Sequence, residues 1–274
     1  MRRTLPVLLL ACLLRADEPP DRLRAEMEKS LGGETAIRRA GHFLLGSRKV
    51  EESDLDGLEE TVTKAQKALQ AQYFRKEPEQ PVAVYLLANA DDYIAFCRDF
   101  TGQAPASRFG FYLRDRKAMV MNIGTGPGTL VHEMTHALMD PDFPGCPSWF
   151  SEGLASLYEQ YSFDADGRIL GHENWRLPLL QRALGDRSAP SWKSLSSFTG
   201  AEFYGEGSGL RYAVARYLCL WLQEQGLLED FYRAFRDSRA NDRTGYETLC
   251  SVVGRPMDEV EKEWAAWARD LKWD

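Results

Sequence analysis

The sequence predicts an α+β fold, with a small mixed sheet in the amino-terminal part and a mostly helical carboxy-terminal lobe. Up to about residue 123, short apolar runs typical of strands alternate with amphipathic helical patterns. Helical periodicity dominates from about residue 128 onward. At 274 residues, 44% of them hydrophobic, the chain can bury a substantial core. We expect a signal peptide over 1–16, an α+β lobe over 17–140 and a helical lobe over 141–274.

The first elements follow from apolar spacing and from residues that begin or end regular structure. Leu23, Met27 and Leu31 share one face, which predicts a helix over 21–40. Ser53 is expected to be the N-cap of a long second helix. The expected elements are then a strand over 43–47, a helix over 53–74, a strand over 81–87 and a helix over 91–100.

A hairpin is expected next, with strands over 109–113 and 118–123 around the charged residues 114–117. Its second strand leads directly toward the following helix, so we expect that strand to form the edge of the sheet beside a cleft. An edge strand can pair with an extended peptide and hold it in place.

The next helix carries the motif HEMTH at 132–136, which places two imidazoles one helical turn apart. Positions i and i+4 lie on one face, so His132 and His136 can hold one metal ion, with Glu133 directed at its open coordination position. Thr129 is the expected N-cap, and the proline-rich run 140–147 is expected to end the helix. This arrangement is typical of a zinc hydrolase.

A catalytic zinc ion usually takes three protein ligands, so a third must be found. Residues 148–159 predict a second helix, and Glu152 lies near its beginning. A glutamate there can also be an ordinary first-turn carboxylate, favoured by the helix dipole. The preceding HEMTH motif favours the ligand interpretation.

HEMTH followed by WFSEGLA at 149–155 resembles the gluzincin metallopeptidases, and within them the bacterial peptidase MA-like proteins. The resemblance is specific over 119–159 and looser over 43–226. It implies a zincin-like fold, a Zn²⁺ cofactor bound by His132, His136 and Glu152, and Glu133 as general base. It further implies an enzyme that hydrolyses peptide or protein substrates.

The chemistry also needs a hydrogen-bond donor for the oxyanion that forms during acyl transfer. In aminopeptidase-like gluzincins this donor is a tyrosine about sixty residues after the glutamate ligand, a spacing that here falls on Tyr212. Tyr204 is the competing residue, and Tyr212 could equally be a core aromatic of its helix. Asp140, Glu159 and Ser156 are open alternatives for the residues that support the ligands.

The amino terminus has the charged and then apolar pattern of a secretion signal, which predicts export. Cleavage after Ala16 and a lipid anchor at Cys12 are the two alternatives. Without Cys12, four cysteines remain, which permits two disulfides or free buried thiols. The other histidines, His42 and His172, are read as a strand residue and a loop residue, the latter with some chance of lining a cleft.

Charge and composition exclude several classes of partner. The formal net charge of −7 argues against nucleic-acid binding, which needs a basic surface. The apolar run at the amino terminus is too short to span a membrane, and no transmembrane segment is expected. The remaining expected elements are helices over 177–184, 209–225, 228–237 and 257–273.

The sequence permits more than one activity at this site. Gluzincin aminopeptidases bind the substrate amino terminus with a G-x-M-E-N strand, whereas this chain has AMVMN at 118–122, without the glutamate. We therefore expect an endopeptidase rather than an exopeptidase. A non-catalytic zinc-binding scaffold is the alternative function, and a structural protein with a chance HEMTH is a third.

Overall fold

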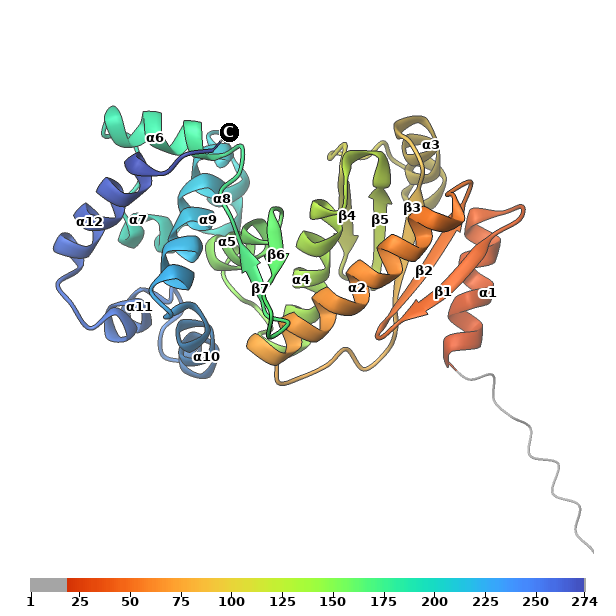
Figure 1. The fold of residues 1–274 in the computed structure, drawn as a ribbon, viewed down its shortest axis with the longest axis horizontal. Coiled ribbons are helices and arrows are strands. Elements are labelled where there is room, and N and C mark those ends of the chain that lie inside the picture. The colour runs from red at the N-terminus through yellow and green to blue at the C-terminus, as the bar shows by residue number, and fades with distance from the viewer. Residues whose placement is uncertain (1–18, 274) are drawn as a thin grey trace, which may run out of the picture.

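A computed structural model describes residues 19–273. These residues form two lobes that lie side by side (Figure 1). One lobe holds a sheet between helices, and the other is mostly helical. In the amino-terminal lobe the elements are α1 Pro19–Leu31, β1 Ala36–Ala40, β2 Phe43–Arg48, α2 Glu52–Gln72, β3 Val82–Leu87, α3 Ala90–Thr101, β4 Gly110–Leu113, β5 Ala118–Asn122, the 3₁₀ turn η1 Ile123–Thr125 and α4 Gly128–Asp142. The rest are α5 Ser148–Leu157, β6 Tyr161–Phe163, β7 Ile169–Gly171, α6 Leu177–Gly185, α7 Trp192–Ser197, α8 Gly200–Tyr204, α9 Ser208–Glu224, α10 Leu228–Ser238, α11 Tyr246–Val253 and α12 Met257–Asp270.

The sheet has five strands in the order β1-β2-β3-β5-β4. The pairs β2–β3 and β3–β5 are parallel, whereas β1–β2 and β4–β5 are antiparallel. The α+β class, the small mixed sheet and the helical carboxy-terminal lobe are thus confirmed.

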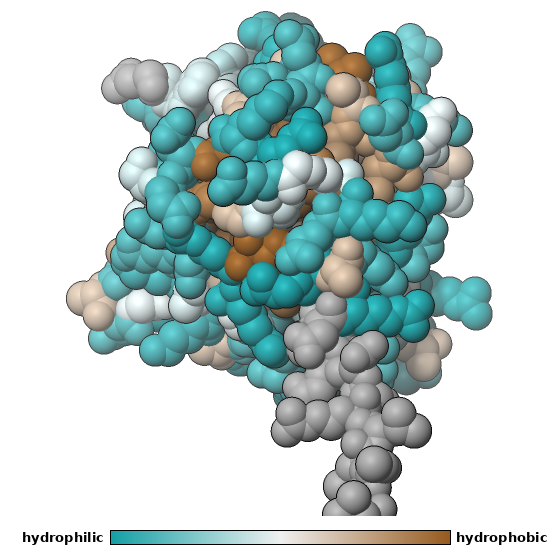
Figure 2. All heavy atoms as spheres, turned by 90° about the vertical axis from the view of Figure 1, so that its right-hand side faces the viewer, coloured by the Kyte–Doolittle hydropathy of each residue, from teal (hydrophilic) through white to brown (hydrophobic). Residues whose placement is uncertain are grey.

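Alternate strand residues face two different apolar layers. Leu45, Val84 and Met119 belong to the core that α2 and α4 cover, and this core continues into the helical lobe. Leu44 and Tyr85 belong to a second, smaller core under α1 and α3. Because both faces are covered, β3 and β5 are buried along their whole length. Figure 2 views the molecule from the side of α1, where hydrophilic side chains cover most of the face and apolar ones show near its centre.

The helix predicted over 21–40 was wrong in its second half, where β1 forms instead. Gly32 and Gly33 have φ angles of 63° and 65°, a left-handed conformation that ends α1. After them the side chains alternate: Ile37 packs on the core beneath α1, whereas Arg38 pairs with Glu52 of α2 at 2.5 Å. That period of two is typical of a strand.

The predicted edge strand was also wrong. β5 pairs with β3 on one side and with β4 on the other, so it lies inside the sheet. β4 is the edge strand, and its contacts with α4 put it beside the HEMTH helix. The sequence predicted the hairpin but not which of its strands would pair with β3, a choice that depends on contacts distant in the chain.

Four predicted helix boundaries need correction. The N-cap of α2 is Glu51, whose carbonyl accepts from the Asp54 and Leu55 amides, and not Ser53. The cap of α4 is Pro127 instead of Thr129, and α4 runs through Pro141 to Asp142. A proline in the last turn removes only one helix hydrogen bond, so it does not end the helix where expected. The helix after it ends at Leu157, before Glu159.

The short β6–β7 hairpin and the helices α7, α8 and α11 were not predicted. The four cysteines of the described chain are free, which excludes the two disulfides within that part. No helix among residues 19–273 is long and apolar enough to cross a membrane. The signal peptide and Cys12 fall outside the described residues.

Candidate functional site

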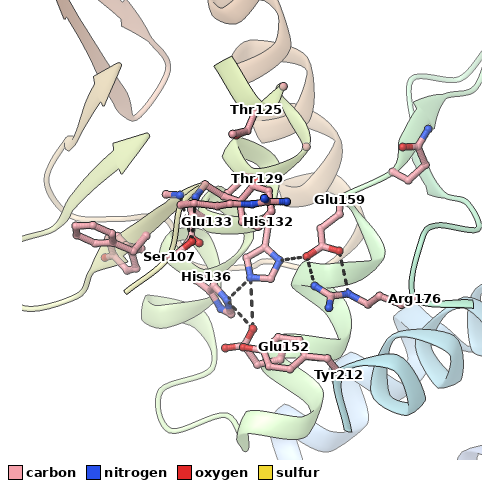
Figure 3. Close-up of a pocket in the computed structure, with 18 of the residues that line it drawn as sticks. Ser107, Thr125, Thr129, His132, Glu133, His136, Glu152, Glu159, Arg176 and Tyr212 are labelled. Atoms are coloured by element: carbon pink, nitrogen blue, oxygen red, sulfur yellow. Dashed lines mark hydrogen bonds and ion pairs between the residues drawn. The ribbon is translucent and has the colours of Figure 1, made fainter. Parts of the chain in front are cut away.

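His132, His136 and Glu152 meet at one point between α4 and α5 (Figure 3). The Nε2 atoms of the two histidines are 3.2 Å apart. The Oε2 atom of Glu152 lies 3.4 Å from Nε2 of His132 and 3.5 Å from Nε2 of His136. All three side chains are buried. The three predicted ligands are therefore close enough to hold one metal ion.

The local sequence explains why α5 brings Glu152 to this point. The carbonyl of Pro147 accepts from the Phe150 and Ser151 amides, so α5 begins directly after the turn that leaves α4. At Gly153, a Cβ would lie 2.9 Å from the carbonyl oxygen of Ala215 in α9. The missing side chain thus lets α5 pack closely on α9, and the adjacent Glu152 faces α4.

Glu133, the neighbour of His132 on α4, lies on the side of the site away from Glu159 (Figure 3). It lines the cleft described below, together with Tyr112 of the edge strand. Burial raises the pKa of the Glu133 carboxyl, although the neighbouring histidines oppose this rise. A carboxyl in such surroundings accepts a proton more readily than one in water.

Each histidine has a second contact through its other ring nitrogen. Nδ1 of His136 lies 3.0 Å from the Ser151 hydroxyl. Nδ1 of His132 lies 3.4 Å from Oε1 of Glu159, and Arg176 and Asn174 hold that carboxylate. The Arg176 guanidinium donates to Oε1 at 2.7 Å and to Oε2 at 3.2 Å, and the Asn174 amide donates to Oε2 at 3.0 Å.

Among the three residues considered for this supporting role, only Glu159 contacts a histidine. Asp140 instead pairs with Arg114 at 2.6 Å. The Ser156 hydroxyl is buried and has no hydrogen-bond partner within the described chain. Ser151 was missed as a supporting residue, although its place directly before Glu152 put it on the same helical turn.

Burial opposes a charged imidazole at His132, but the carboxylates of Glu152 and Glu159 outweigh that effect and raise its pKa to about 10. Burial likewise opposes a charged Glu152, yet the adjacent histidines hold the pKa of its carboxyl well below its usual range. The site thus places negative charge around the two imidazoles, which favours a cation there.

Both tyrosines considered as oxyanion donors lie at the site. The Tyr204 hydroxyl donates to Oε1 of Glu152 at 2.7 Å. The Tyr212 ring lies next to that of Tyr204, with centroids 6.4 Å apart, and the Arg176 guanidinium lies 5.1 Å from its centre. Burial and the Glu152 carboxylate raise the pKa of both phenols, so both keep their protons at neutral pH.

These groups open into a cleft of about 1450 Å³ between the two lobes. β4 and the segment before it form one side, and the residues around α5, α8 and α9 form the other. His172 does not line the cleft, and its ring contacts the Ser162 hydroxyl at 2.6 Å. His42 lies at the far end of β2, where it contacts Glu77 at 3.0 Å.

No protein-family model and no curated protein matches this chain.

Gly128 offers a test of how α4 is held against the site. A Cβ at this first residue of α4 would lie 2.2 Å from the backbone carbonyl oxygen of Glu159. We expect Gly128→Ala to lower the free energy of unfolding by about 1–3 kcal/mol, because backbone must move. Gly57→Ala, in an α2 position with open space, is the control and should raise it by about 0.5–1 kcal/mol. Urea unfolding of both variants measures this, and equal values would contradict the packing argument.

Proposed function

We propose that this protein is a zinc-dependent metallopeptidase in which His132, His136 and Glu152 bind the metal and Glu133 is the general base. The observation that carries the proposal is the spacing of the three ligand atoms, 3.2, 3.4 and 3.5 Å. Ligands about 2.0–2.1 Å from a tetrahedral zinc ion are about 3.3–3.4 Å from one another. The spacing thus fits zinc without any movement of the side chains.

A second observation supports the metal. Oε2 of Glu152 is buried and has no hydrogen-bond partner within the described chain. A buried carboxylate oxygen without a partner is costly, and a cation satisfies it. Ser151 and Glu159 lie beside the Nδ1 atoms of His136 and His132, respectively, and the Nε2 atoms of both histidines face Glu152.

The residues around the ligands fit hydrolysis. Zinc bound there would supply a Lewis acid that activates water near neutral pH. Glu133 would take the proton of the attacking water and hand it to the departing amine. A phenol of Tyr212 or Tyr204, protonated at neutral pH, would donate to the oxyanion.

The cleft favours a polypeptide over a small molecule. Its volume of about 1450 Å³ exceeds the roughly 300–1,000 Å³ of typical small-molecule pockets. β4 runs along it and pairs with a strand on only one side within the described chain, so an extended peptide can add to its outer edge. This role falls to β4 rather than to residues 118–123, and it suits an endopeptidase. The gluzincin resemblance and the zincin-like fold belong to the same proposal.

A non-catalytic zinc-binding scaffold is the alternative, because it needs the same three ligands. The position of Glu133 distinguishes the two functions. A scaffold has no use for a carboxyl in the cleft next to the ligands, whereas a hydrolase needs one as general base.

The first test is metal content and cleavage by the same preparation. We expect elemental analysis of purified protein to give about one zinc per chain. A mixed peptide library, followed by mass spectrometry, should then show internal cleavage that a chelator abolishes and added zinc restores. Zinc without cleavage would favour the scaffold, and a protein without zinc would refute the proposal.

The Glu159 contact predicts an effect on metal affinity. We expect Glu159→Gln to weaken zinc binding by about 10–100-fold, because the supporting carboxylate of His132 loses its charge. Competition with a chromophoric chelator measures the change. Asp140→Asn, on the helix of His132 but paired with Arg114, is the control and should leave affinity within about twofold. Equal affinities in both variants would exclude a supporting role for Glu159.

A further inference from the structure

Exposed aromatic side chains gather at the cleft. Five large apolar side chains stand out as exposed in the described chain: Phe109, Trp175, Leu179, Tyr204 and Trp273. Phe109, Trp175 and Tyr204 line the cleft, with 36%, 49% and 52% of their surface exposed. Exposed apolar surface concentrated in one place marks a binding site more often than chance.

Phe109 is held in place although its ring is open to solvent. Its carbonyl accepts from the Asn122 amide of β5 at 2.8 Å, and its own amide donates to the Ser107 hydroxyl at 3.2 Å. The Asn122 side chain also donates to the carbonyl of Arg108 at 3.0 Å, and Tyr93 donates to that of Ser107 at 2.8 Å. An exposed ring on a backbone fixed in this way is prepared for a ligand and loses little entropy on binding.

Trp175 is fixed in a similar way from the other lobe. Its two neighbours, Asn174 and Arg176, both hold the carboxylate of Glu159. The Asn174 backbone N–H donates to the Tyr217 hydroxyl at 3.0 Å. The Trp175 ring itself stays half exposed, with the Arg176 guanidinium 5.6 Å from its centre.

The residues next to the two rings lie on opposite sides of His132. Figure 3 draws Ser107 and Arg176 on opposite sides of His132, and these residues lie close in sequence to Phe109 and Trp175, respectively. A peptide that follows β4 across the metal ligands would therefore pass one ring before the scissile bond and the other after it.

We infer that the cleft selects polypeptide segments with bulky apolar side chains on both sides of the cleaved bond, one contacting Phe109 and the other Trp175. This inference rests on the proposed function for the bond that is cleaved, but selection can be measured as binding alone. Aromatic rings favour aromatic and large aliphatic partners through area burial and ring contacts.

The test uses the zinc-loaded Glu133→Gln variant, which keeps the cleft without turning over the peptide. Labelled nonapeptides of alanine and serine carry phenylalanine at one, both or neither of the two positions that flank the central bond. We expect each phenylalanine to tighten binding by about tenfold, as measured by fluorescence anisotropy. Equal affinity for all the peptides would overturn the inference.

Second-site variants assign each ring to one peptide position. Added to Glu133→Gln, Phe109→Ser should remove the preference at one flanking position and Trp175→Ser the preference at the other. Trp175→Phe should retain the preference that Trp175→Ser removes. Trp273→Ser, with a similar exposure of 46% outside the cleft, is the matched control and should change neither. Preferences that survive both serine variants, with thermal melting unchanged, would overturn the assignment.

Cleavage by the wild-type protein separates this inference from the proposed function. Selective binding without any cleavage would refute the peptidase and leave the selection intact. Cleavage without preference for bulky apolar side chains would refute the selection and leave the peptidase intact.

Discussion

Glu133→Gln is expected to keep one zinc per chain while lowering kcat for peptide cleavage by about 10²–10⁴-fold. The amide has the size of the carboxyl but cannot accept the proton of the attacking water. Glu133 is not among the three residues whose ligand atoms converge, so the metal should remain. Elemental analysis and initial-rate kinetics on the same preparations measure both quantities.

A glutamate outside the cleft provides the control for this change. Glu206 is exposed in the turn before α9, and Glu206→Gln should leave kcat and zinc content unchanged. Full cleavage by Glu133→Gln would exclude the general base. Loss of zinc together with cleavage would mean that Glu133 also supports the metal, and the kinetic effect would then say nothing about proton transfer.

The closeness of the three proposed ligands could be predicted from sequence because it depends on local geometry. His132 and His136 are one turn apart on a single helix, so their convergence needs only the helical period. Glu152 follows after a short turn, and its approach needs only that α5 packs against α4. The strands β3 and β5 were likewise predicted from their apolar runs, although β5 was expected at the sheet edge.

The parts that were missed depend on contacts distant in the chain. Which strand forms the sheet edge follows from β5 pairing with β3, about thirty residues earlier. Glu159 supports His132 only because Arg176 and Asn174, after an unpredicted hairpin, hold its carboxylate. The strand β1 was not predicted because its alternating pattern is short. No proline separates that pattern from the helical pattern before it. No local signal fixes any of these pairings.

The two tyrosines should respond differently to loss of the hydroxyl. The Tyr204 hydroxyl is already bonded to Glu152, so Tyr204→Phe removes support from a metal ligand. Tyr212 lines the cleft beside it, and the Glu152 carboxylate raises the pKa of its phenol, but the short hydrogen bond to that carboxylate comes from Tyr204. We therefore expect Tyr212→Phe to lower kcat by about 10²–10³-fold with zinc affinity unchanged. Tyr204→Phe should instead weaken zinc binding, with a smaller effect on kcat at saturating zinc.

Kinetics at saturating zinc, combined with chelator competition, separate the two roles. An oxyanion donor acts only in the transition state, so its loss lowers kcat with little change in KM. A residue that supports Glu152 acts on the free enzyme, so added zinc restores most of the activity. Should Tyr204→Phe show the larger fall in kcat under saturating zinc, the Tyr204 hydroxyl would have to leave Glu152 for the substrate. Tyr212 would then be a packing residue of α9, against Phe203 at 5.2 Å between ring centres.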